Sequence, residues 1–396
     1  MKNIHPLFIS LCFLCLCACQ TKTEKTTATY NIGLMEAKKI TLPIDENTYY
    51  LSRSIFQFEE DNKEYLSFGN FEKKQYEIIL YDIEKEDIHK RIPLMKEGPN
   101  GVNGIIGLKP YDGSKSFLCF QHNSFRFSII DGEGNLLKQF STAPQDKKFM
   151  MSIDGISYFH YPSFVIDSVI HFHQGPQYLG SRERGIKQED WKEFHMFASL
   201  NFRNGKIDWL LNFPSIFDHD VKNPAGGHGF SYDYNYKENR LVCSFTGYDS
   251  LMVTDDLQHI RWYDGKSRYL KTMRPILPEA NLGVQALVDM KEAPQYLHIM
   301  YDKYRDLYYR FAEHPCELGP NEAFMNDPKA REFSVIIFDK DLNIIGETKF
   351  PGNKYFYKMS FVGRDGLYIS ENNEANPEFD EDKLVFACFK LEDLKE

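Results

Sequence analysis

A short pattern recurs along most of this chain: an apolar run typical of a β-strand, a polar turn that usually carries Asp or Asn, and then a second strand. The apolar runs lie at residues 78–82, 127–131, 197–201, 251–255, 335–339 and 384–389. Their average step is about 61 residues, which blades with long loops can reach. Antiparallel meanders repeated around a channel form a β-propeller. The sequence therefore predicts an all-β fold, a six-bladed β-propeller, with seven blades as the alternative.

Composition favours the same fold class. Aromatic residues make up 15% of the chain, and such side chains suit the half-buried surfaces of sheets. From residue 37 onward no long amphipathic helix is evident. We therefore expect residues 37–396 to form a single propeller domain, with insertions after the second and fourth apolar runs, where the steps are longest.

The last apolar run lies near the C-terminus, so its blade must take its outer strand from elsewhere. Residues 38–43 form an isolated strand-like segment before the first blade. Closing the ring removes an exposed edge strand. We expect this N-terminal strand to pair with the C-terminal blade at residues 384–392.

The N-terminus has the pattern of an export signal. Lys2 is followed by an apolar run over residues 7–17, which is too short to span a bilayer. Ala18 directly before Cys19 resembles the lipobox of bacterial lipoproteins, in which the cysteine becomes the lipidated first residue. This resemblance implies a signal peptide over 1–18, a lipid anchor on Cys19 and a flexible tether over 19–36. An ordinary signal peptide is the alternative.

Charge limits the partners that the protein can have. The net charge of −10 excludes nucleic acid as an electrostatic partner, and no dense Lys/Arg cluster indicates binding to an anionic membrane. We expect attachment through lipid on Cys19. Gln20 follows it instead of the Asp that retains lipoproteins in the inner membrane, and Glu24 is the one acidic residue in 20–25. These features favour an outer-membrane anchor facing the periplasm, with the cell surface as the alternative.

Four cysteines remain beyond the signal: Cys119, Cys243, Cys316 and Cys388. An even number in an oxidising compartment permits two disulfides in any of three pairings. Three of the four lie inside separate apolar runs, where isolated cysteines usually act as small buried hydrophobes. We therefore favour free thiols, with disulfides as the alternative.

Three segments resemble a family of lipoproteins from Bacteroidota, built as six-bladed propeller-like domains of unknown function. They are EGPNGVNGI at 97–105, IDGEG at 130–134 and YDKYRDLYYRF at 301–311. The resemblance covers nearly the whole mature chain and implies export, lipidation and the propeller fold. It assigns no catalytic residue.

The segment 301–311 is the best candidate for a functional surface. If it is one continuous strand, alternation places Asp302, Tyr304, Asp306, Tyr308 and Arg310 on one face. Tyrosine rings and arginine forks suit the binding of a glycan or peptide. We expect Tyr304, Arg305, Tyr308 and Arg310 to contact the ligand. The alternative is a blade in which Arg–Asp pairs tie neighbouring strands together.

Two strand histidines, His171 and His173, point to one face. With His219, Asp220 or His228 from a loop they would make a zinc site. The alternative is that they fill a polar channel.

Two other segments could bind ions or phosphate. The acidic stretches 371–374 and 378–382 could hold calcium, although a solvated hairpin tip is the usual explanation. The glycine-rich segment 97–107 could cradle a phosphate, but a tight connection between blades is favoured. No cofactor is predicted, and zinc or calcium are the ions these residues could hold.

Three functions are compatible with the sequence. The favoured one is a non-enzymatic binding or scaffold propeller in the cell envelope that recognises a glycan, a peptide or a partner protein. The second is a propeller enzyme, such as a glycan hydrolase, lyase or lactonase, acting at the central channel through His171, His173, Asp302 or Asp306. The third is a structural subunit of an envelope complex. Neither a Gly-x-Ser-x-Gly nor a His-Glu-x-x-His motif is present, which disfavours a serine hydrolase or a zincin.

Overall fold

The computed structural model describes residues 23–71, 76–121, 126–141, 161–173, 195–214, 229–271, 288, 292–318 and 331–394. Regular structure in these ranges is almost entirely β-strand. None of the described helical residues belongs to a helix long and apolar enough to cross a membrane. Residues 1–18 and Cys19, which carry the predicted signal and lipid anchor, lie outside the described residues.

The strands form five sheets. Three sheets have four strands each. The first consists of β3 (Ile55–Glu60), β4 (Lys63–Asn70), β5 (Tyr76–Asp82) and β6 (Asp87–Leu94). The second consists of β7 (Ile105–Asp112), β8 (Ser116–Gln121), β9 (Arg126–Asp131) and β10 (Leu136–Ser141), and the third of β11 (Phe164–Ile166), β12 (Val169–His173), β13 (His195–Asn201) and β14 (Ile207–Asn212). The fourth sheet has five strands: β15 (Phe230–Asn235), β16 (Arg240–Phe245), β17 (Ser250–Thr254), β18 (Arg261–Asp264) and β1 (Thr23–Glu24). The fifth has eight, in the order β19 (Gln295–Asp302), β20 (Leu307–Glu313), β21 (Phe333–Phe338), β22 (Ile344–Phe350), β2 (Ala28–Pro43), β25 (Lys383–Asp393), β24 (Leu367–Ser370) and β23 (Phe356–Val362).

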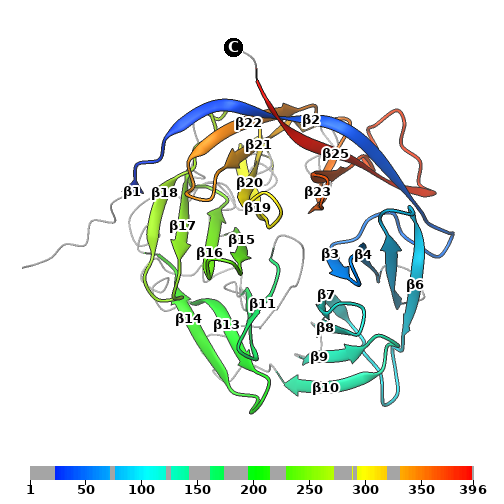
Figure 1. The fold of residues 1–396 in the computed structure, drawn as a ribbon. Helices are drawn as coiled ribbons and strands as arrows, with labels where there is room; N and C mark the ends of the chain where they lie inside the picture. Colours follow the sequence, from blue (N-terminus) through cyan, green and yellow to red (C-terminus); the bar gives the residue numbers. More distant parts are fainter. Residues whose placement is uncertain are drawn as a thin grey trace, which may run out of the picture.

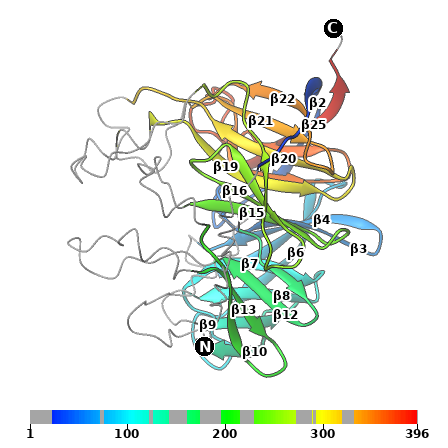
Figure 2. The same cartoon turned by 90° about the vertical axis from the view of Figure 1, so that its left-hand side faces the viewer.

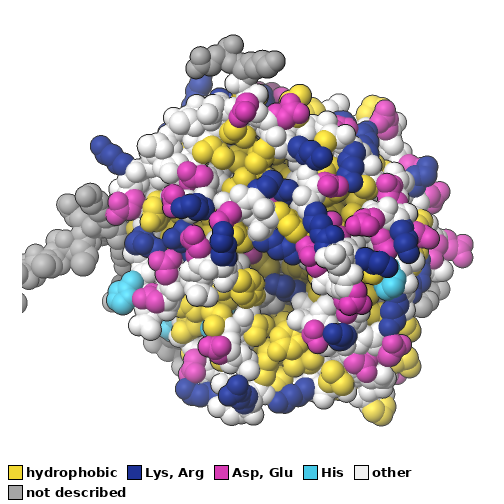
Figure 3. All heavy atoms as spheres, viewed as in Figure 1, with side chains coloured by type: hydrophobic (Ala, Val, Ile, Leu, Met, Phe, Trp, Pro, Cys, Tyr) yellow, Lys and Arg dark blue, Asp and Glu magenta, His cyan; other side chains and the backbone are white. Residues whose placement is uncertain are grey.

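These sheets are arranged like the blades of a propeller. In Figure 1, β3, β7, β11, β15, β19 and β23 lie toward the centre, whereas β6, β10, β14 and β18 lie at the rim. Figure 2 shows the same sheets from the side, with β2 and β25 again together at one edge. The space-filling view shows a central hollow on this face, bordered by hydrophobic and charged side chains (Figure 3). The predicted all-β, propeller-like fold is thus confirmed.

The predicted repeat is real, but the strands do not form six separate sheets. The six apolar runs fall on β5, β9, β13, β17, β21 and β25, and each is the third strand of an antiparallel meander. The last two meanders are merged into the eight-stranded sheet because β2 pairs with both β22 and β25. A blade count of six therefore does not follow from the sheets themselves.

The strand β2 closes the ring as the sequence predicts. Its antiparallel register with β25 runs from Ile32 opposite Asp393 to Pro43 opposite Lys383, which includes the expected segment 38–43. The strand begins at Ala28, however, so much of the segment 19–36 expected as a tether is paired strand instead. The reason is burial on one side of the strand, where Leu34 and Leu42 enter two different hydrophobic clusters.

Side chains from neighbouring sheets satisfy backbone groups along the inner edges. The Ser231 hydroxyl on β15 accepts a hydrogen bond from the Ile299 amide at 2.9 Å and donates to the Leu297 carbonyl at 2.9 Å, both on β19. The Lys109 ammonium on β7 donates to the Ser163 carbonyl at 2.5 Å, just before β11. Buried backbone groups without partners are costly, so these polar side chains connect one sheet to the next.

The core consists of aromatic-rich clusters packed within and between the sheets. Cys119, Cys243 and Cys388 are buried in three different clusters. Burial raises the pKa of the Cys119 thiol well above its usual range. These three cysteines are thus buried thiols, as their separate apolar runs indicate.

We predict that Leu42→Ala lowers the free energy of unfolding by about 2–5 kcal/mol, because it opens a cavity where β2 closes the ring. The measurement is a urea unfolding curve. Thr41→Ala is the matched control, since Thr41 is the exposed neighbour on the same strand, and we expect a change below about 1 kcal/mol. Equal effects of the two substitutions would show that ring closure does not depend on the buried face of β2.

Candidate binding pocket

The segment 301–311 is a hairpin and not the continuous strand expected from its sequence. β19 ends at Asp302, β20 begins at Leu307, and Tyr301 lies opposite Tyr308. The carboxylate of Asp302 accepts hydrogen bonds from the amides of Tyr304 and Arg305, both at 3.0 Å. This side-chain capping is typical of Asp in turns. The expected alternation of five polar and aromatic residues on one face is therefore wrong.

Tyr304 and Arg305, expected to contact a ligand, lie in this turn and connect it to two neighbouring hairpins. The Gln57 amide donates to the Tyr304 hydroxyl at 2.8 Å. The Arg305 guanidinium donates to the carbonyls of Gly363 and Arg364, each at 2.8 Å. These contacts tie the turn to neighbouring strands through Gln57 and through backbone carbonyls. The Arg–Asp pair of the alternative, Arg305 with Asp302, lies within the turn itself.

Tyr308 and Arg310, the other two expected ligand contacts, are both fully buried. The Arg310 guanidinium lies 3.5 Å from the ring centre of Tyr296. It donates to the carbonyls of Asp249 at 2.5 Å and Gly265 at 2.9 Å. Arg310 therefore lies away from any surface, and it positions the backbone of a loop on the neighbouring sheet.

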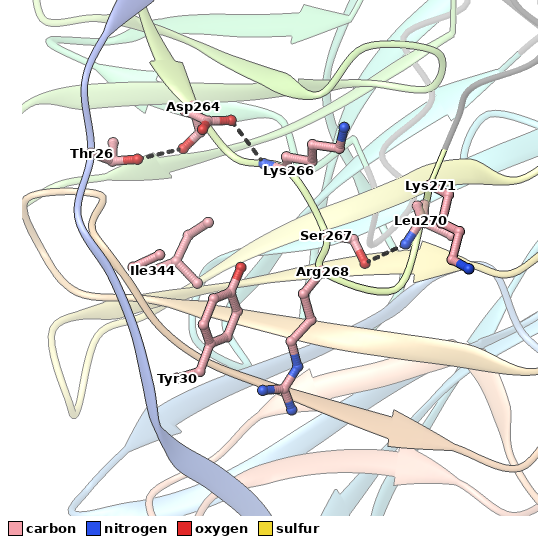
Figure 4. Close-up of a pocket in the computed structure, with 10 residues that line it drawn as sticks. Thr26, Tyr30, Asp264, Lys266, Ser267, Arg268, Leu270, Lys271 and Ile344 are labelled. Carbon is pink, nitrogen blue, oxygen red and sulfur yellow. Dashed lines mark hydrogen bonds between the residues drawn. The ribbon is translucent and has the colours of Figure 1, made fainter.

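That loop, residues 264–271, forms one wall of a pocket of about 350 Å³ (Figure 4). The opposite wall comes from the beginning of β2 and from β22. The lining residues are Thr26, Ala28, Tyr30, Asp264, Lys266, Ser267, Arg268, Leu270, Lys271 and Ile344. No sequence motif marks this pocket, because its walls come from three separate segments, and the beginning of β2 lies more than 200 positions from the loop 264–271.

A buried carboxylate fixes the conformation of the loop 264–271 through hydrogen bonds. Glu347 on β22 is 1% exposed and accepts hydrogen bonds from the Ser267 hydroxyl at 2.5 Å and the Arg268 amide at 2.8 Å. The Ser267 hydroxyl in turn accepts from the amides of Tyr269 and Leu270. Burial raises the pKa of Glu347, against the opposing effect of its hydrogen bonds. The pocket wall is thus set by an internal polar network and does not need a ligand to form.

Tyr30 enters the pocket through an irregularity in β2. The register with β22 shifts between Ala28, opposite Ile344, and Ile32, opposite Gly346. Tyr30 has a φ of 53° there, a left-handed conformation that costs energy for a non-glycine residue. Figure 4 shows the Tyr30 hydroxyl pointing into the space between Ile344 and the loop. Bulges often redirect a side chain next to a functional site.

The charged residues of the lining are mainly cationic. They are Lys266, Arg268 and Lys271, and Asp264 is the one carboxylate among the described lining residues. The Lys266 ammonium also lies 3.8 Å from the carboxylate of Asp249, outside the lining. The Arg268 guanidinium lies 4.8 Å from the ring centre of Tyr30 and donates to the Glu347 carbonyl at 3.0 Å. These contacts hold it at the edge of the pocket. Cations and hydroxyl donors in this arrangement suit an acidic group such as phosphate or carboxylate.

The two strand histidines lie in aromatic packing. His171 stacks against Phe164 with ring centres 4.9 Å apart, and His173 packs against Phe230 at 4.7 Å. Burial lowers the pKa of His171 to about 4 and that of His173 to about 3. In the part of the chain that the structure describes, no group of three His, Cys, Asp or Glu residues could hold a metal ion. The other expected ligands, His219, Asp220 and His228, lie outside that part.

The remaining candidate segments are accounted for by structural contacts. In the stretch 371–374, the buried carboxylate of Glu371 pairs with Lys39 at 2.8 Å and Lys354 at 3.2 Å. Asp380, in the stretch 378–382, pairs with Lys383 at 2.7 Å. The glycine-rich segment 97–107 connects β6 to β7 and extends into its first residues, with a turn in which Gly98 has a φ of 89°. It is thus the connection that the sequence favours.

Comparisons with known proteins concern the family and the fold. The profile of the family described as "Domain of unknown function (DUF4221)" matches residues 31–349. A crystal structure of a member of that family from Bacteroides vulgatus is 51% identical, with a TM-score of 0.84, and the match covers 92% of this chain and 99% of that chain. A putative exported protein from Bacteroides fragilis shares the fold alone, at 9% identity and a TM-score of 0.52, over 94% of this chain and 99% of that chain. No curated protein matches the chain.

We predict that acid destabilises the protein through His171 and His173. Their folded pKa values lie below the usual 6.5, so the unfolded state binds more protons. The stability is therefore complete above about pH 6.5 and is lost as the pH falls toward 4, by up to about 1.4 kcal/mol per pH unit for each histidine.

Unfolding curves at several pH values test this, because His173→Phe should make the slope shallower. The control is Phe230→Leu, which loosens the packing beside His173 without removing a titrating group. It should lower the stability equally at every pH. An unchanged slope in His173→Phe would contradict the prediction.

Proposed function

We propose that this chain, which belongs to the DUF4221 family of domains of unknown function, is a binding protein whose propeller-like fold presents a pocket for an acidic ligand. The observation that carries the proposal is the lining of that pocket, which holds three cationic residues, Lys266, Arg268 and Lys271, and one carboxylate, Asp264. The ligand carries a phosphate or carboxylate group that these cations and the Tyr30 hydroxyl can bind.

The composition of the pocket supports binding more than catalysis. General acid–base chemistry needs convergent ionisable groups with suitable pKa values. The described lining offers cations and hydroxyl groups around Asp264, whose side chain accepts a hydrogen bond from the Lys266 amide at 3.2 Å. A propeller enzyme acting at the central channel remains the second function suggested by the sequence, and no contact in the described residues favours it.

A rigid platform also favours binding. The loop 264–271 is held by Arg310 and Glu347 before any ligand arrives, and preorganised sites lose less entropy on binding. For this role we count the eight-stranded sheet as two blades joined through β2, which gives six blades around the channel.

The proposed location is the cell envelope. The pattern at residues 1–19 supports export and lipidation of Cys19, and the anchor would hold the domain on the periplasmic side of the outer membrane. Because β1 already begins at Thr23, the segment between anchor and domain is short.

We predict that inorganic phosphate or a sugar carboxylate such as glucuronate raises the melting temperature of the full chain, because a ligand that binds only the native state stabilises it. Arg268→Gln should weaken binding roughly tenfold or more, since hydrogen bonds to charged groups contribute about 1.5–3 kcal/mol. Isothermal titration gives the affinities.

Lys63→Gln is the matched control for this titration. It removes one exposed positive charge on β4 and should leave the affinity unchanged. If neither anion shifts the melting temperature, or if both variants bind alike, the pocket is not an anion site.

We also predict that the exported protein carries lipid on Cys19. Metabolic labelling with a fatty acid should mark the wild-type chain and leave Cys19→Ala unlabelled. Labelling that persists in Cys19→Ala would contradict an anchor at this residue.

A further inference from the structure

We propose that the acidic group bound in this pocket is the phosphate of an anionic membrane lipid, taken from the leaflet that holds the protein's own anchor. The inference rests on the proposed function and names its ligand. Its physical basis is the position of the pocket along the chain, because the segment that leads to the anchor forms one of its walls.

The N-terminal segment is tied to the pocket on both sides. β1 pairs in parallel with β18, with Thr23 opposite Trp262. The Thr26 hydroxyl donates to the Asp264 carbonyl at 3.1 Å (Figure 4), and the Thr27 amide donates to the Asn343 side chain at 3.0 Å. These contacts fix the segment 23–27 against the walls of the pocket.

The distance from the predicted anchor to the pocket is short. Thr26 lines the pocket and lies seven residues after Cys19. A fully extended chain spans at most about 3.6 Å per residue, so lipid on Cys19 would keep the pocket within about 25 Å of the membrane surface. A pocket elsewhere on the ring would not be held so close by the chain itself.

The charges around the pocket are positive on balance. Lys25 follows β1 directly and is exposed, like Lys266, Arg268 and Lys271 on the loop 264–271, whereas Glu24 and Asp264 are the exposed acidic residues of the same two segments. Lys266 also pairs with Asp249 at 3.8 Å, so Lys25, Arg268 and Lys271 are the cations offered to a phosphate. The chain as a whole carries a net charge of −10, so this grouping opposes the overall charge. The sequence shows no dense Lys/Arg cluster, because the fold brings Lys25 to the loop from far away in the chain.

A phosphate contact would also orient the anchored domain. Each Lys or Arg near an anionic surface contributes about 1 kcal/mol. The pocket would therefore set which face of the ring is turned toward the bilayer.

The test uses the chain from residue 20 onward, so that neither lipid on Cys19 nor the apolar run at 7–17 contributes to binding. Flotation compares vesicles of phosphatidylcholine with vesicles that also contain phosphatidylglycerol. We expect the protein to float with the phosphatidylglycerol vesicles alone and Lys271→Gln to bind them about fivefold more weakly, the equivalent of one surface cation. Lys63→Gln is the control and should bind like the parent chain.

The outcomes separate the lipid from free phosphate and from non-specific charge. If inorganic phosphate or glycerol 3-phosphate binds the pocket but no vesicle is bound, the lipid assignment is wrong and the anion pocket stands. If Lys63→Gln weakens vesicle binding as much as Lys271→Gln does, the attraction is general charge and the proposal is overturned. If neither free phosphate nor vesicles bind, both the pocket function and its lipid ligand fail. Weaker vesicle binding in Lys271→Gln and Arg268→Gln than in Lys63→Gln, with competition by glycerol 3-phosphate, supports the proposal.

Discussion

The pairing of β2 with β22 on one side and β25 on the other is the contact on which the rest of the structure depends. The last meander, β23 to β25, has only three strands of its own, and without β2 its buried strand β25 would present an open edge. β2 covers this edge from the N-terminus and buries Leu34 and Leu42 in two clusters. The same pairing places the N-terminal segment against the pocket.

The second constraint is the demand of buried polar groups for partners. Arg310, fully buried, is held by carbonyls of the neighbouring sheet and by the Tyr296 ring. Glu347 holds the loop through Ser267 and Arg268. A buried charge is tolerated only when such contacts compensate its desolvation. The network therefore does two things at once: it joins adjacent sheets and gives the pocket wall one defined shape.

Residues 301–311 form a hairpin and not the continuous strand expected from their sequence, for a simple physical reason. Alternation of side chains holds only while the backbone stays extended, and here Asp302 folds the chain back by accepting the amides of Tyr304 and Arg305. Asp306 then adopts a φ of 56°. An Asp followed four residues later by a second Asp was a usable turn signal. Arg310 was expected to contact a ligand, but it is fully buried and donates to backbone carbonyls of the next sheet.

Local sequence determined the fold class, the position of the third strand in each meander and the strand that closes the ring, because apolar runs, turn residues and an unpaired end are local properties. It also determined that Cys119, Cys243 and Cys388 would lie apart in the core. Only the tertiary structure decided the merging of two meanders and the pocket between Tyr30 and Arg268. These features depend on contacts between segments more than 200 positions apart, and the pattern of residues along one segment carries no information about its distant partner.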